Sequence, residues 1–251
     1  MTIILAIAGK GGVGKSTVAA LLVRALHERG KGVIMAVDAD PNSNLGQKLG
    51  VTVERTIGEL REDLLKRADE IPPGQSKQEF VEYQMQLAKV EGDYFDLIAM
   101  GRPEGAGCYC YINNILRTFL DLAMQKYDYV VIDNEAGMEH LSRRTTKKMD
   151  VLAIVTDYTK VGLETAGRLF SLAREMKISI GKTALIINLM PESTSSMVER
   201  MIDELDTDVV ARIPRSEEIA KRAVEGRPLL DLPASDPAYT GVQRILRLTG
   251  Q

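Results

Sequence analysis

A glycine-rich segment near the N-terminus constrains the fold of this chain more than any other feature. Residues 9–16 read Gly-Lys-Gly-Gly-Val-Gly-Lys-Ser, between an apolar run at residues 3–8 and a helical pattern that begins at Thr17. A strand, a glycine-rich loop and a helix in this order predict a phosphate-binding loop, because backbone N–H groups at a helix N-terminus can surround a phosphate chain. Lys15 can reach the β- and γ-phosphates, and Ser16 can bind Mg²⁺. The predicted nucleotide-binding residues of this segment are Gly9, Gly11, Gly12, Val13, Gly14, Lys15, Ser16 and Thr17.

A second lysine in the loop, Lys10, directly follows the first glycine. Its side chain leaves the loop at the wrong end to serve its own triphosphate easily, but it can reach the phosphates of a facing subunit. The pattern of residues 10–16 resembles the deviant Walker A loop of the MinD/ParA and nitrogenase iron protein superclass. The resemblance implies a homodimer that encloses its nucleotides between two subunits, with Lys10 and Lys15 both catalytic.

The remaining sequence alternates between strand and helix patterns, which predicts a mostly parallel sheet with helices on both faces. The chain has 251 residues, 45% of them hydrophobic, and no Pro/Ser-rich linker divides it. We therefore expect one α/β domain over residues 1–251, a P-loop NTPase. Two charged helices, at residues 55–70 and 77–90, are expected to form an exposed insertion. Other strands are expected at residues 33–37, 94–100, 129–132, 151–156, 183–188 and 209–213, and other helices at residues 17–28, 111–126, 139–148, 163–176 and 195–205.

Composition and charge narrow the classes of partner. A net charge of −3 and a pI near 5.6 argue against a broad nucleic-acid footprint, which requires a basic surface. No apolar run reaches the length of a membrane span, and residues 1–8 enter a strand without a signal-peptide pattern. We expect a cytoplasmic protein without stable membrane association. The apolar stripe at residues 242–248 is expected to dock on the protein's own sheet.

Two aspartates follow apolar strands whose carboxyl ends should meet beside the phosphate loop. Hydrolysis requires a group that orients water, and Mg²⁺ requires an acidic anchor in addition to Ser16. Asp40 and Asp133 are the candidates, and Asp38 would lie near Mg²⁺ or its water ligands because it is two residues earlier on the same side of its strand. The Asp-Pro pair at residues 40–41 resembles switch I of the superclass, which implies that Asp40 positions the attacking water.

Residues 133–137, Asp-Asn-Glu-Ala-Gly, resemble the Asp-x-x-Ala-Gly switch II of the same superclass. The resemblance implies that Asp133 contacts the metal through water and that Gly137 offers its N–H to the γ-phosphate. Asn188, at the end of a strand, resembles the asparagine that reads adenine, and Pro214 belongs to a segment that resembles the second base-contact loop. ATP is preferred over GTP because Leu-Met-Pro, rather than the remainder of the guanine-reading Asn-Lys-x-Asp pattern, follows Asn188.

The chain has only two cysteines, Cys108 and Cys110, separated by one residue in a glycine-containing loop. A structural disulfide framework is therefore excluded, and such a close thiol pair in a reducing compartment indicates metal or redox chemistry. Two thiolates make an incomplete tetrahedral site. The four thiolates of a face-to-face dimer could share one ion, and metal affinity would then depend on the nucleotide state.

The segment at residues 101–108 resembles the cluster-ligand loop of the nitrogenase iron protein, but the switch II region here contains no cysteine. The Gly-x-Cys-Tyr-Cys sequence, with Asp-Asn-Glu-Ala-Gly-Met-Glu-His downstream, more closely resembles the CooC/AcsF nickel-insertion ATPases, and this resemblance covers essentially the whole chain. It implies that Cys108 and Cys110 bind Ni²⁺ or Zn²⁺ at a homodimer interface, and that ATP hydrolysis accompanies nickel delivery to apo carbon monoxide dehydrogenase or acetyl-CoA synthase. Two alternatives remain open: an ATP-gated iron–sulfur redox protein, and a positioning ATPase of the MinD/ParA kind.

Overall fold

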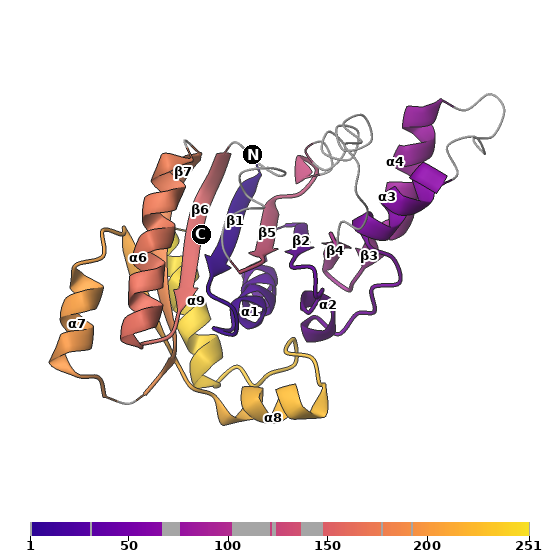
Figure 1. Cartoon of the computed structure of the whole chain (residues 1–251). Coiled ribbons are helices and arrows are strands. Elements are labelled where there is room, and N and C mark those ends of the chain that lie inside the picture. Colours follow the sequence, from indigo (N-terminus) through magenta and orange to yellow (C-terminus); the bar gives the residue numbers. More distant parts are fainter. Residues whose placement is uncertain are drawn as a thin grey trace.

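The fold is built on a twisted, mostly parallel sheet. The computed structural model describes residues 2–30, 32–66, 76–101, 121, 124–136, 148–176, 178–191 and 193–250. In these ranges eight strands form one sheet in the order β3-β4-β2-β5-β1-β6-β7-β8 (Figure 1). Every neighbouring pair is parallel except β3 with β4. The strands are β1 (Ile3–Gly9), β2 (Ile34–Ala39), β3 (Val90–Glu91), β4 (Phe95–Ala99), β5 (Tyr129–Asn134), β6 (Lys148–Thr156), β7 (Ser179–Met190) and β8 (Val209–Pro214).

Helices cover both faces of the sheet, as the sequence predicts. One hydrophobic cluster joins α1, α2 and α9 to one face, and two further clusters join α6 with α7, and α3 with α4, to the other face. The prediction of a single α/β domain with a mostly parallel sheet is confirmed. The described helices are α1 (Lys15–Glu28), α2 (Leu45–Lys48), α3 (Ile57–Lys66), α4 (Lys77–Ala88), α6 (Lys160–Glu175), α7 (Ser196–Asp203), α8 (Glu217–Glu225) and α9 (Pro237–Thr249).

Side chains alternate between the two faces of each strand. In β1, Leu5 and Ile7 belong to the cluster on the α1 side, whereas Ala6 and Ala8 belong to the cluster on the α6 side. The same alternation holds in β2, β5 and β7. In these strands the side chains on the α1 side are apolar along the strand and polar where the strand ends. The sheet therefore gathers polar side chains on its α1 side, next to the loop between β1 and α1.

The two charged helices α3 and α4 are less exposed than the sequence suggested. They lie beside β3 and β4 at one end of the sheet (Figure 1). Ile57, Leu60, Leu64 and Met85 are all less than 10% exposed and pack against β2, β4 and β5. The prediction of an exposed insertion is therefore wrong for their inner faces, because the apolar residues lie at helical spacing and bury against the sheet.

Several boundaries also differ from the prediction. Lys148, expected at the end of a helix, is the first residue of β6, and the sequence analysis did not find α2, α8 or the short edge strand β3. Residues 139–147 of the helix expected at 139–148, and most of the helix expected at 111–126, lie outside the described residues.

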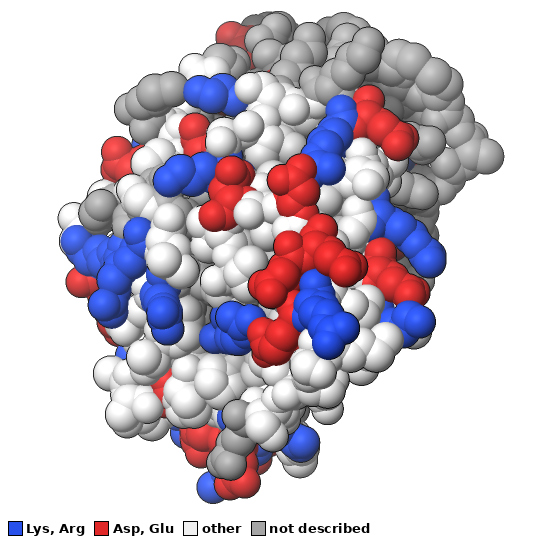
Figure 2. Space-filling model, turned by 90° about the vertical axis from the view of Figure 1, so that its left-hand side faces the viewer, with Lys and Arg blue, Asp and Glu red and all other residues white. Residues whose placement is uncertain are grey.

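The C-terminal helix packs on its own domain. Val242, Ile245 and Leu246 in α9 are at most 2% exposed and join the cluster on the α1 side, which confirms the predicted docking. Within the described ranges, each helix is too short or too polar to cross a bilayer. Figure 2 shows acidic and basic side chains interspersed on one face of the molecule. A face that binds nucleic acid would instead gather lysine and arginine.

Candidate functional site

The loop between β1 and α1 is pressed against β6 and β7 so closely that two positions accept only glycine. A Cβ on Gly9, where φ is 149°, would lie 2.1 Å from the carbonyl oxygen of Val155. A Cβ on Gly14, where φ is 91°, would lie 2.4 Å from Nδ2 of Asn188. Both backbone conformation and space therefore require the glycines that the motif supplies.

The two lysines of the loop have different environments. Lys15 is 6% exposed, and its ammonium group donates a hydrogen bond to the carbonyl oxygen of Lys10 at 3.1 Å. This bond folds the Lys15 side chain back over the loop. The side chain of Lys10 itself is exposed. The exposure of Lys10 is compatible with a role outside its own loop, and the burial of Lys15 with one inside it.

Two buried carboxyl groups lie side by side at the carboxyl ends of β2 and β5. Asp38 and Asp133 are register partners in this parallel pair, and both are 0% exposed. The Asp38 carboxylate accepts hydrogen bonds from the backbone N–H of Leu45 at 2.8 Å and of Asp40 at 3.1 Å. Burial nevertheless raises the pKa of Asp38 to about 6. The group is held in place but is costly to ionise.

Asp133 is more strongly perturbed. Burial raises its pKa to about 7, the neighbouring Asp38 carboxylate adds to the rise, and the Ser16 hydroxyl and the Lys15 ammonium oppose it. Among the described residues, neither Asp133 oxygen accepts a hydrogen bond of good geometry. A buried carboxylate without a strong partner, beside a second carboxylate and a hydroxyl, has the hard oxygen donors that Mg²⁺ prefers. Ser16, Asp38 and Asp133 therefore fit a magnesium ion.

Asp40 stands outside this buried pair, in the turn after β2. It is half-buried, and its Oδ1 accepts hydrogen bonds from the backbone N–H and the side-chain amide of Asn42, at 2.9 and 3.0 Å. Ser43, three residues after Asp40 in the same turn, has a positive φ of 49°. The turn thus fixes one carboxylate oxygen of Asp40 and leaves the group at the edge of the site, where water can reach it.

A cleft of about 540 Å³ lies between the phosphate loop and α8. Both predicted base-contact residues, Asn188 and Pro214, line it. The Asn188 amide donates to the carbonyl oxygen of Val13 at 2.8 Å, so that it also ties β7 to the loop. The polar phosphate loop lines one side of the cleft, and apolar residues of α1 and α8 line the other. This lining suits a ligand that has a phosphate part and an aromatic part.

Several residues that line this cleft were not predicted from the sequence. Only Asp157 had a usable signal, because it follows an apolar strand in the same way as Asp133 does. The structure places it at the end of β6, where its Oδ1 accepts a hydrogen bond from the N–H of Thr159 at 2.9 Å. The missed residues are Val18, Leu21, Asp157, Tyr158, Thr159, Leu189, Arg215, Ser216, Ile219, Ala220, Ala223 and Ala238.

Three predicted site residues, Gly137, Cys108 and Cys110, lie outside the described residues. Gly137 directly follows Ala136, whose Cβ would be 3.9 Å from a Cβ placed on Gly11. Within the ranges that the structure describes, no cluster of three or more His, Cys, Asp or Glu side chains could hold a metal ion. The cysteine site therefore remains a prediction.

The sequence profile of the CobQ/CobB/MinD/ParA nucleotide binding domain matches residues 4–229. An uncharacterized ATP-binding protein of Methanocaldococcus jannaschii is 42% identical over 244 residues, which cover 96% of each chain. The carbon monoxide dehydrogenase accessory protein CooC of Rhodospirillum rubrum is 35% identical over 198 residues, covering 69% of this chain and 70% of CooC. MinD of Pyrococcus horikoshii, solved with Mg-ADP, superimposes with a TM-score of 0.69 at 22% identity, covering 99% of this chain and 95% of MinD.

Proposed function

The chain belongs to the CobQ/CobB/MinD/ParA nucleotide-binding domain family, and from this premise we propose that it is an ATPase that delivers nickel to a carbon monoxide dehydrogenase or acetyl-CoA synthase. The observation that carries the finer proposal is the similarity to CooC in a chain that contains Cys108-Tyr109-Cys110. The ATPase part of the proposal rests on the phosphate loop and the buried acidic pair described above.

The proposed hydrolysis assigns one task to each group at the site. Lys15 and the loop N–H groups hold the phosphates, and Ser16, Asp38 and Asp133 hold Mg²⁺, which neutralises phosphate charge when bound. Asp40 orients the attacking water from the edge of the site. Lys10 reaches the phosphates bound by the facing subunit of a homodimer. Asn188 and Pro214 contact the adenine base.

The chain that leads toward the cysteine segment is hydrogen-bonded to the end of β2, just before switch I. The N–H of Met100, after β4, donates to the carbonyl oxygen of Asp38 at 2.7 Å, and the N–H of Gly58 donates to the carbonyl oxygen of Met100 at 2.9 Å. The segment that contains Cys108 thus begins next to the magnesium ligands. This link supports a nickel affinity that depends on the nucleotide state.

Loss of Cys108 should remove tight nickel binding and leave ATP binding intact. We expect anaerobically purified protein, incubated with Ni²⁺, to retain one ion per two chains, because four thiolates complete a site that two cannot. Cys108→Ser should retain none, as measured by metal analysis with mass determination. Met197→Ser, which removes an exposed sulfur elsewhere, is the control and should keep its nickel. Stoichiometric nickel in Cys108→Ser would place the site elsewhere.

Lys10 should act on the facing subunit. Lys10→Ala and Lys15→Ala should each be nearly inactive in phosphate release, because the first lacks the lysine for its partner and the second cannot hold the triphosphate. An equimolar mixture should recover roughly a quarter of wild-type activity, since half of the dimers are mixed and each has one complete site. A mixture no more active than its components would show that Lys10 does not act across a dimer.

The alternatives are separable by direct measurements. An iron–sulfur absorption spectrum of the anaerobic protein would favour the redox protein. ATP-dependent sedimentation with liposomes would favour the positioning ATPase. The burial of Val242, Ile245 and Leu246 in α9 weakens that second alternative, because it leaves Leu248, at 44% exposed, as the one exposed leucine of the stripe at residues 242–248.

A further inference from the structure

Helix α8 forms one wall of the nucleotide cleft. Ser216, Ile219, Ala220 and Ala223 line the cleft from this side, opposite Val18 and Leu21 of α1. Within α8, all of whose residues are described, Arg222 is the one residue that is fully buried, at 4% exposed. Ile219 is half-buried and packs against the cluster on the α1 side, so apolar contact holds part of α8, and the polar contacts of Arg222 hold the helix further along.

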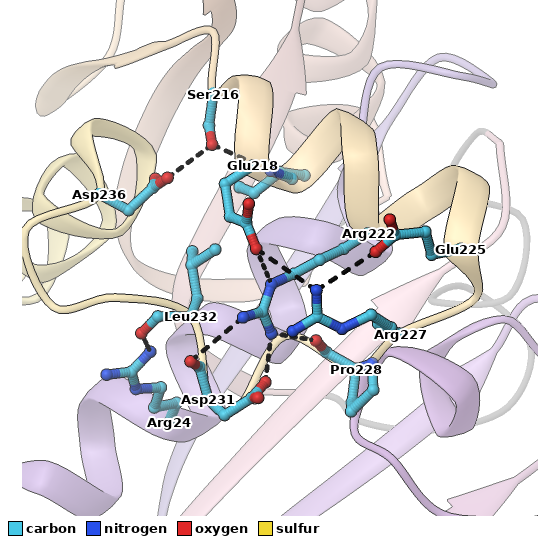
Figure 3. Close-up of polar contacts among 11 residues, drawn as sticks. Arg24, Ser216, Glu218, Arg222, Glu225, Arg227, Pro228, Asp231, Leu232 and Asp236 are labelled. Carbon is cyan, nitrogen blue, oxygen red and sulfur yellow. Dashed lines mark hydrogen bonds and ion pairs between the residues drawn. The ribbon is translucent and has the colours of Figure 1, made fainter.

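Arg222 does not line the cleft, and its guanidinium group makes polar contacts with Glu218 and with the segment that follows α8 (Figure 3). Its Nε donates to the Glu218 carboxylate at 2.8 Å, one turn earlier in the helix. Its terminal nitrogens donate to the carbonyl oxygen of Pro228 at 2.8 Å, to the carbonyl oxygen of Asp231 at 3.3 Å and to the Asp231 carboxylate. One guanidinium group thus joins the helix to two points of the segment that follows it. The guanidinium group is buried, whereas its partners are partly exposed, and hydrogen bonds to a buried charged group are costly to lose.

The segment at residues 228–232 is itself firmly attached. The N–H of Leu229 donates to the carbonyl oxygen of Lys48 in α2 at 2.8 Å, and the carbonyl oxygen of Leu232 accepts a hydrogen bond from Arg24 of α1. Leu229 and Leu232 are 3% and 1% exposed and belong to the main core cluster. Arg222 therefore connects α8 to a part of the molecule that does not move independently of the core.

The N-terminus of α8 has a second attachment. The Ser216 hydroxyl caps the helix by accepting a hydrogen bond from the N–H of Ile219 at 3.1 Å, and it donates to the Asp236 carboxylate at 2.6 Å. Asp236 in turn caps α9. Ser216 lies in the cleft, whereas Arg222 does not line it. Arg222 can therefore be changed without removing a group that would touch the ligand.

We propose that Arg222 is a positioning residue that sets the affinity for the nucleoside part of the nucleotide by holding α8 as a wall of the cleft. The inference rests on the nucleotide site proposed above. It predicts a selective effect, because the phosphate loop is attached to β1, β6 and β7 and does not depend on α8. Loss of Arg222 should weaken ligands that carry a base and leave a bare phosphate chain unaffected.

Arg222→Gln should raise the dissociation constant for Mg-ATP about tenfold, a loss that corresponds to about 1.4 kcal/mol. The dissociation constant for tripolyphosphate should change by less than about twofold, which corresponds to less than about 0.5 kcal/mol, because this ligand has no base to contact α8. Both are measured by calorimetry on the full chain. Arg227→Gln is the matched control: Arg227 forms exposed ion pairs with Glu218 and Glu225 and should leave both constants unchanged.

If Arg222→Gln does not fold, Asp231→Ala tests the same contact, because the Asp231 side chain is 67% exposed and its loss leaves the core intact. It should also weaken Mg-ATP selectively. Equal losses for Mg-ATP and tripolyphosphate, or an unchanged Mg-ATP constant, would overturn the proposed role of Arg222 alone. A wild-type protein that binds tripolyphosphate but gains no affinity from the base would overturn the proposed base site, and this inference with it.

Discussion

Asp40→Ala is expected to lower ATP turnover on the order of 10³-fold, because a positioned group that orients or deprotonates water contributes on that scale. ATP binding should change by less than about twofold, since the carboxylate stands at the edge of the site and is held by Asn42 rather than by the phosphate loop. With binding intact and hydrolysis lost, the ATP-bound dimer should accumulate. Phosphate release and size-exclusion chromatography with ATP measure the two effects.

The matched control is Asp93→Ala. Asp93 is an exposed aspartate just before β4, at the amino end of the strands and so on the opposite edge of the sheet from the site. Its loss should affect neither measurement. An Asp40→Ala protein with wild-type turnover would overturn the assignment of Asp40, and one that no longer binds ATP would show that Asp40 contacts the nucleotide directly.

The phosphate loop and the acidic strand ends were predictable because local rules determine them. Gly9 and Gly14 are required by backbone conformation and close approach, so the motif carries its own geometry. Asp38 and Asp133 could be placed together because each follows an apolar strand, and the carboxyl ends of parallel strands meet at one edge of the sheet. Side chains alternate between the two faces of a strand, so a shift of one residue would place each carboxyl group on the opposite face of the sheet.

The wall formed by α8 was not predictable for the opposite reason. Its sequence is rich in charged residues, and its buried residue is Arg222. Most of the groups that Arg222 contacts lie in the segment at residues 228–232, after the helix. No hydrophobic periodicity reports such a contact. The burial of α3 could have been predicted, because Ile57, Leu60 and Leu64 lie at helical spacing. The high charge of the helix led instead to a prediction of exposure, although apolar spacing is the more reliable guide to an inward face.

The buried acidic pair leads to an unusual expectation, that removing a charge stabilises the protein. Asp133→Asn should raise the melting temperature at pH 8 without Mg²⁺ or nucleotide. The carboxyl ionises near its ordinary value of 3.8 in the unfolded chain and near 7 in the folded one. Between these values the folded state keeps a proton that the unfolded state has released, so stability falls as pH rises through this window and the loss is complete above pH 7.

The size of the effect follows from the same values. Each pH unit of the rise corresponds to about 1.4 kcal/mol, so the ionised Asp133 destabilises the fold by about 4 kcal/mol at pH 8. An asparagine amide in the same place also lacks a good partner, which costs about 1–3 kcal/mol. We expect a net gain of about 2 kcal/mol, or roughly 4–8 °C for a chain of this size. The gain should vanish near pH 5, because this lies only about one unit above 3.8 and the remaining loss in wild type, about 1.6 kcal/mol, no longer exceeds the cost of the asparagine amide.

Magnesium nucleotide should reverse this order, because the ionised carboxylate is what holds the cation. With Mg-ADP added, wild type should gain more stability than Asp133→Asn, so that the difference at pH 8 narrows or changes sign. Asp93→Asn, an exposed aspartate, should show neither the pH dependence nor the reversal. If Asp133→Asn is less stable than wild type at pH 8 without Mg²⁺, the folded state tolerates the charge of Asp133. The buried pair of Asp38 and Asp133 would then not depend on a cation for its stability. The expected pattern, by contrast, would show that the fold accepts an unfavourable buried charge in exchange for a site that binds magnesium.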